Sequence, residues 1–178
     1  MGLVLLLRDI VVALLDAMAG QARRRYEHSV VIQAPVRTVW DMLKSRDIQF
    51  PGRFPLRVVA EPVAGRSGVE RVHILAGKIS LTMMTRIVEE RSERAILYQL
   101  LAEGTDPALI EGDDDYVGFV LVEQPTGTRL DLVRETTPRS WMARLTIPIG
   151  LRSGGGRYKR KAEEMALSAV GDAGVGRP

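Results

Sequence analysis

Apolar and polar residues alternate along most of the chain between residue 26 and about residue 136. From Tyr26 this alternation predicts a first strand, which ends at Ala34-Pro35. The spacing of apolar residues then becomes helical and predicts one short amphipathic helix, with these residues on its apolar face: Val36, Val39, Trp40 and Leu43. We expect the domain to open with a strand followed by a helix.

Six further strands are predicted after Pro55. Their expected ranges are 56–62, 68–76, 78–90, 93–102, 115–124 and 127–136. Short turns rich in glycine and polar residues separate these strands, and no long helical pattern lies between them, so consecutive strands should pair as an antiparallel meander. Alternation also assigns an inward face to each strand. The inward residues are Leu56, Val58, Val72, Ile74, Leu81, Met83, Ile87, Ile96, Tyr98, Leu100, Val117, Phe119, Leu121, Leu130 and Leu132.

The last predicted element is a helix that begins near Pro138. Its apolar residues recur at four-residue spacing: Trp141, Leu145 and Ile149. Residues that oppose helix formation follow at Pro148, Gly150 and 154–156, so we expect a bend or a break there. Helix should resume near Arg157, and residues 171–178 should form a flexible tail because they are rich in glycine.

The N-terminal segment, residues 3–19, is almost entirely apolar. Its charged residues Arg8, Asp9 and Asp16 fall on one narrow arc of a helix, and three arginines follow at 23–25. These charges argue against a simple spanning anchor, and the segment lacks the basic start of a signal peptide. We expect residues 1–25 to form an accessory helix and a basic linker. This helix would meet a membrane surface or a membrane protein, or pack in a homodimer.

Composition and charge limit the domain number, the possible chemistry and the expected partners. The chain of 178 residues has 46% hydrophobic residues, which suits one globular domain with a sizeable core. It has no cysteine, which excludes disulfides and thiolate chemistry. The net charge of +3 is modest and spread along the chain, so nucleic acid is not an expected partner.

Three stretches resemble START-like (SRPBCC) proteins. Residues 26–43, YEHSVVIQAPVRTVWDML, are similar to the family's opening, in which a strand ends in Ala-Pro and a helix with Val-Trp follows. Residues 118–135, GFVLVEQPTGTRLDLVRE, resemble its penultimate hairpin, and residues 157–165 resemble the end of its closing helix. The resemblance implies an α+β, helix-grip domain over residues 26–170. In that fold a curved antiparallel sheet of about seven strands wraps on a long C-terminal helix.

The same resemblance implies a cavity between sheet and helix that holds a hydrophobic small molecule. Combined with the inward faces assigned above, it predicts these ligand-binding residues: Leu81, Met83, Ile96, Tyr98, Phe119, Leu121 and Trp141. Met84 should face away from the cavity. We interpret Trp40 as a core anchor, because it lies on the apolar stripe of a predicted helix.

No catalytic or metal-binding motif stands out in the sequence. The two histidines, His28 and His73, lie on different predicted strands without ligand spacing, so we expect no metal and no cofactor. The acidic residues around 111–115 lack the spacing of a calcium loop and should form a solvated loop. Some START-like members are aromatase/cyclases with polar residues in the cavity, which draws attention to Arg71, His73, Arg86 and Tyr98. The first three alternate out of phase with the apolar faces and should face solvent.

The function expected from these features is non-enzymatic binding or transport of a lipid, quinone or aromatic molecule. The expected location is the cytoplasm, and peripheral association with the inner face of the membrane stays open. Two alternatives also stay open: a polyketide cyclase or dehydrase type of enzyme, and a docking module for a membrane complex.

Overall fold

The computed structural model describes residues 23–52, 55–107, 109, 114–138 and 141–175 of the chain. The apolar segment 3–19, for which we predict an accessory helix, lies outside these residues. Two helices and eight strands make up the described part. In chain order they are β1 (Arg24–Ile32), α2 (Val36–Lys44), β2 (Asp47–Phe50), β3 (Leu56–Pro62), β4 (Val69–Ala76), β5 (Ile79–Arg91), β6 (Ala95–Leu101), β7 (Tyr116–Gln124), β8 (Gly127–Thr136) and α3 (Trp141–Val175).

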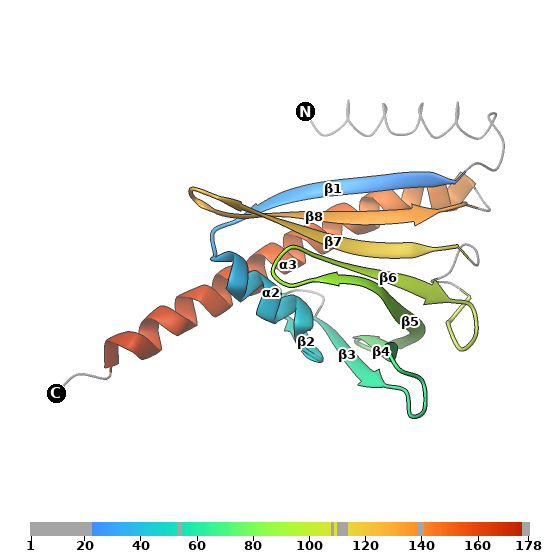
Figure 1. Ribbon diagram of the computed structural model, residues 1–178, viewed down its shortest axis with the longest axis horizontal. Helices are drawn as coiled ribbons and strands as arrows, with labels where there is room; N and C mark the ends of the chain where they lie inside the picture. Colours follow the sequence, from blue (N-terminus) through green and yellow to red (C-terminus); the bar gives the residue numbers. More distant parts are fainter. Residues whose placement is uncertain (1–22, 53–54, 108, 110–113, 139–140, 176–178) are drawn as a thin grey trace.

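The strands form one antiparallel sheet in the order β1-β8-β7-β6-β5-β4-β3-β2. The long helix α3 runs across one face of this sheet, and α2 lies on the same side (Figure 1). The predicted α+β class and the antiparallel meander are confirmed. The expected number of about seven strands was one too low, because a four-residue strand, β2, lies between α2 and the Pro- and Gly-rich passage and alternates Ile48 and Phe50 inward.

We expected a bend or a break in the C-terminal helix, with helix resuming near Arg157. The break is wrong, because α3 is continuous through Pro148 and the three glycines at 154–156. The glycines have a packing role at Gly155, which is buried against the sheet. A Cβ atom at Gly155 would lie 2.8 Å from Cδ2 of His28 on β1, so only glycine lets the helix approach this closely. The helix also continues to Val175, into the stretch for which we expected a flexible tail.

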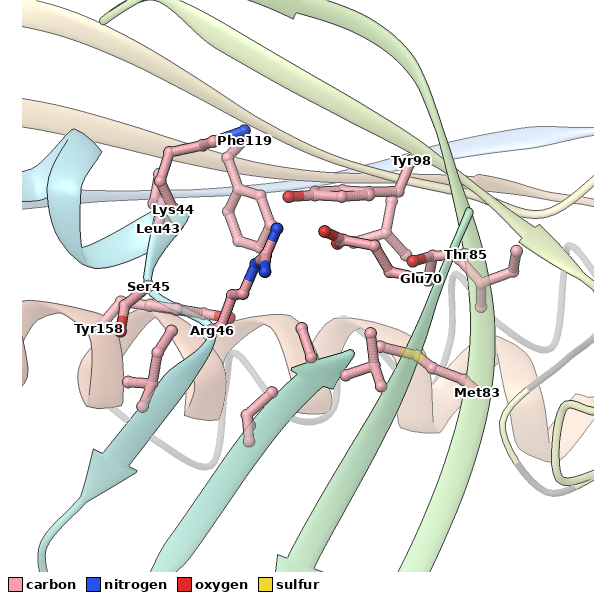
Figure 2. Close-up of a pocket in the computed structure, with 16 residues that line it drawn as sticks. Leu43, Lys44, Ser45, Arg46, Glu70, Met83, Thr85, Tyr98, Phe119 and Tyr158 are labelled. Carbon is pink, nitrogen blue, oxygen red and sulfur yellow. The ribbon is translucent and has the colours of Figure 1, made fainter. Parts of the chain in front are cut away.

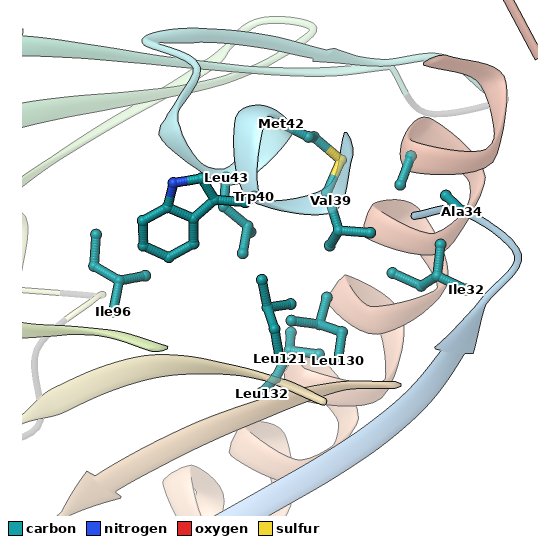
Figure 3. Close-up of a cluster of buried hydrophobic side chains, with 11 residues drawn as sticks. Ile32, Ala34, Val39, Trp40, Met42, Leu43, Ile96, Leu121, Leu130 and Leu132 are labelled. Carbon is teal, nitrogen blue, oxygen red and sulfur yellow. The ribbon is translucent and has the colours of Figure 1, made fainter. Parts of the chain in front are cut away.

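The core lies between α2, α3 and the β1, β7 and β8 end of the sheet (Figure 3). Its fully buried members include Ile32, Met42 and Leu130, and Ala162 reaches it from α3. The β7–β8 turn closes against the end of β1, since a Cβ atom at Gly127 would lie 2.1 Å from the carbonyl oxygen of Ile32. The Thr128 hydroxyl donates to the Ala34 carbonyl at 2.8 Å beside it. This cluster anchors α2 and leaves the other end of the inner face for a cavity.

Two charge arrangements differ from expectation. Asp115, expected in a solvated acidic loop, is fully buried and accepts hydrogen bonds from the Arg134 guanidinium, with Nε at 3.0 Å. The arginines expected to form a basic linker reach into the sheet edge, where Arg23 and Arg25 both pair with Glu135. A buried carboxylate needs such a partner, and Arg134 supplies it for Asp115.

Within the described part of the chain, no helix is long and apolar enough to cross a bilayer.

Candidate functional site

A cavity of about 330 Å³ lies between the inner face of strands β2 to β7, the C-terminal end of α2 and the middle of α3 (Figure 2). Its apolar lining comes from six strands and from α2. The apolar residues are Leu43, Ile48, Val58, Ala60, Val72, Met83, Leu100, Val117 and Phe119. A space of this size is at the lower end of the range that small-molecule pockets show in proteins.

Strand register places these side chains together. Val72 on β4 is opposite Met83 on β5, and Tyr98 on β6 is opposite Val117 on β7. Successive residues of a strand point to opposite faces, so every second residue of each strand contributes to the lining. Met84 faces the other way, where it is buried under the segment after β6, and its amide donates to the Thr105 hydroxyl at 2.8 Å.

Aromatic side chains close the cavity on the helix side. The ring of Tyr158 on α3 packs edge-on against Phe119, with centroids 5.3 Å apart, and against Phe50, with centroids 5.2 Å apart. Burial raises the pKa of the Tyr158 hydroxyl to about 12. Burial, and then the negative charge of Glu70, raise the pKa of Tyr98 well above its usual value. Both phenols therefore stay neutral at physiological pH and serve as hydrogen-bonding groups.

Polar groups interrupt the apolar wall on one side. The guanidinium of Arg46, the carboxylate of Glu70 and the hydroxyl of Tyr98 point into the same space in Figure 2. The Thr85 side chain also lines the cavity; it is only 3% exposed, and its hydroxyl has no hydrogen-bond partner in the described structure. Lys44 at the rim differs, because its ammonium group pairs with Glu90 at 2.8 Å.

The seven predicted ligand-binding residues divide into groups. Met83, Tyr98 and Phe119 line the cavity. Ile96 and Leu121 are buried in the core cluster with Trp40 instead, because α2 covers that end of the inner face. Leu81 is partly buried and does not line the cavity. On β5 the lining residues are Met83 and Thr85.

The seventh of them, Trp141, begins α3, and its side chain is not among those described.

Several lining residues were not predicted from the sequence. Glu70 and Thr85 have the same parity as Val72 and Met83, so alternation alone could have placed them on the inner face. A polar residue on the inner face does not extend an apolar pattern, so the pattern does not indicate these two residues. Arg46 and Tyr158 come from a connection and from a helix, and no strand pattern could have pointed to them.

The arginines and histidines named above as candidate polar residues lie outside the cavity. Arg71 and Arg86 are exposed, as predicted, and the His73 ring lies 3.1 Å from the Thr82 hydroxyl on the outer face of the sheet. His28 packs under Gly155, and burial lowers the pKa of its imidazole, with the positive charge of Arg152 adding to this effect. Among the residues that the structure describes, no cluster of His, Asp or Glu could hold a metal ion.

No family model and no curated protein matches the chain by sequence. Solved structures do match. The di-domain ARO/CYC StfQ from the steffimycin biosynthetic pathway is 14% identical with a TM-score of 0.60, over 85% of this chain and 53% of that one. The Zhui aromatase/cyclase from a Streptomyces species is 16% identical with a TM-score of 0.56, over 84% of this chain and 96% of that one. The fold is the START-like helix-grip fold.

An AHSA1-like protein from Aeromonas hydrophila shares this START-like fold. It is 12% identical with a TM-score of 0.53, over 82% of this chain and 94% of that chain. At such low identity the likeness extends to the fold alone, so the lining residues of this chain have to be interpreted from their own geometry.

Proposed function

We propose that the chain binds a hydrophobic small molecule, such as a lipid, a quinone or an aromatic compound, in this cavity. The observation that carries the proposal is the space of about 330 Å³ walled by apolar and aromatic side chains. Protein interiors are otherwise close-packed, so a volume of this size is expected to have an occupant of matching surface. The walls belong to hydrogen-bonded strands and a long helix, which give the cavity a continuous frame.

A cavity-filling variant tests the proposal. Met83→Trp places a bulky indole in the cavity and should weaken binding of N-phenyl-1-naphthylamine, a neutral probe that fluoresces in apolar surroundings, by at least about tenfold through steric exclusion. Met142→Trp is the matched control, because it makes the same exchange at a position that is 49% exposed on α3. The control should bind the probe like the parent protein. Unchanged binding by a folded Met83→Trp variant would contradict the proposed site.

A cyclase or dehydrase activity is the second candidate. The charged groups of Arg46 and Glu70 in an otherwise apolar cavity favour it, and two proteins of similar fold carry the name aromatase/cyclase. The raised pKa of Tyr98 counts against this phenol as a general base near neutral pH, because the phenolate is rarely formed. Mass spectrometry before and after incubation with a co-purified ligand separates the candidates: a carrier returns the ligand unchanged, and an enzyme returns a product.

A further inference from the structure

We propose that the cavity selects a neutral apolar molecule that carries a hydroxyl group, which donates to the Glu70 carboxylate and accepts from the Thr85 hydroxyl. This inference rests on the proposed function, since it names the class of ligand for the same cavity. It assigns specificity to a polar group of three side chains, Glu70, Thr85 and Tyr98, on the inner face of adjacent strands.

Strand register brings the three side chains together. Glu70 on β4 is directly opposite Thr85 on β5. Thr85 is opposite Leu100 on β6, which makes Tyr98, two residues earlier, its diagonal neighbour on the same face. Opposite and diagonal neighbours on one face of a sheet lie within reach of one another's side chains. A single ligand group in the cavity can therefore meet all three.

Thr85 shows that the polar group is incomplete without an additional partner. Its side chain is 3% exposed, and its hydroxyl oxygen has no hydrogen-bond partner in the described structure. A buried hydroxyl that makes no hydrogen bond destabilises the folded protein, and most buried polar side chains are satisfied. Because the residue lines the cavity, a hydroxyl-bearing ligand is placed to supply the missing hydrogen bond.

Glu70 sets the charge of the ligand. Its side chain is partly buried, and no ion pair or hydrogen bond of its carboxylate is found among the described residues. An ionised carboxylate only accepts hydrogen bonds, so it favours a ligand group that donates and repels a ligand carboxylate. Arg46 points to the same space but is exposed at the rim, where water screens its attraction for an anion (Figure 2).

Three probes of one shape test this selectivity in competition with N-phenyl-1-naphthylamine at pH 7. They are 2-naphthol, naphthalene and 2-naphthoate. We expect 2-naphthol to bind about tenfold more tightly than naphthalene because of its hydrogen bonds to Glu70 and Thr85, and 2-naphthoate to bind most weakly. Thr85→Val should reduce the preference for 2-naphthol severalfold, because only the hydrogen bond to Glu70 remains, and should affect naphthalene binding much less. Glu70→Gln should raise the affinity for 2-naphthoate by about tenfold, because the repelling charge is gone.

Control variants keep the result interpretable. Thr82→Val makes the same exchange on β5 at a residue whose hydroxyl lies beside His73 and outside the cavity, so it should keep the preference for 2-naphthol. Thr85→Ser retains a hydroxyl and should also keep it, even if Thr85→Val proves unstable.

The outcomes separate the inference from the proposed function. Equal binding of 2-naphthol and naphthalene by the parent protein, or a preference of unchanged size in Thr85→Val, would overturn the inference and leave the proposed function standing. Tightest binding of 2-naphthoate would also overturn it and would assign recognition to Arg46. Failure of the competitor itself, N-phenyl-1-naphthylamine, and of all three naphthyl probes to bind would overturn both.

Discussion

Trp40 illustrates how one side chain supports the site without lining it. It lies on the inner face of α2, is 8% exposed, and packs in the core cluster with residues such as Ile96 and Leu121 (Figure 3). The ammonium group of Lys44 lies 6.0 Å from the centre of its ring. These contacts hold α2 on the sheet, and the next residues of the chain form the rim of the cavity.

Trp40→Ala should lower the free energy of unfolding by about 3 to 5 kcal/mol, as truncation of a large core side chain does. Chemical denaturation of parent and variant measures this loss. Under conditions in which the variant is fully folded, its affinity for N-phenyl-1-naphthylamine should equal that of the parent. A variant that melts like the parent but no longer binds the probe would contradict the structural role of Trp40.

At the scale of elements, α3 covers the inner face of the sheet and closes one side of the cavity. It spans the sheet without a break, contributes Tyr158 to the cavity, and packs against β1 where Gly155 meets His28. The next glycine, Gly156, has no atom within 4 Å of the position that a Cβ would take. Two neighbouring glycines thus differ in whether they carry a packing constraint.

Gly156→Ala should stabilise the protein by about 1 kcal/mol, because alanine favours helix over glycine. Gly155→Ala should lose that gain, since its Cβ would lie 2.8 Å from the His28 ring. In a His28→Ala background the same Gly155→Ala exchange should become stabilising. Thermal melting of Gly156→Ala, Gly155→Ala, His28→Ala and the Gly155→Ala/His28→Ala double variant tests this. An equal gain in stability for both glycine variants in the parent background would show that the close approach to His28 does not affect stability.

The N-terminal apolar segment 3–19 concerns the whole molecule, and we propose that it meets a membrane surface. A helix that is apolar over most of its circumference is unfavourable in water. The arginines that follow it have exposed side chains, with Arg23 at 50% and Arg25 at 57%, although both pair with Glu135.

The full chain should sediment with vesicles that contain phosphatidylglycerol. Arg23→Gln should weaken this association by about fivefold, since a basic residue near an anionic surface contributes about 1 kcal/mol. Arg160→Gln, at an exposed position on α3, is the matched control and should change it little. A chain that does not bind vesicles and is a dimer in solution would contradict this proposal and would indicate that the segment mediates self-association.

Local patterns determined much of this structure. Alternation along the chain was enough to predict the meander, the inward position of Met83, Tyr98 and Phe119, and the outward position of Met84, because side-chain direction follows from residue parity within a strand. The Ala-Pro step and the apolar spacing after it were enough to predict α2 with Trp40 on its buried face.

Tertiary structure decided what periodicity does not encode. The helix α3 stays continuous through Pro148 and the glycines because packing against β1 and β8 outweighs weak local propensity. The position of α2 turned Ile96 and Leu121 into core residues instead of lining residues. Only the pairing register placed Glu70, Thr85 and Tyr98 side by side, since residues far apart in sequence share a site through strand partners that no local pattern specifies.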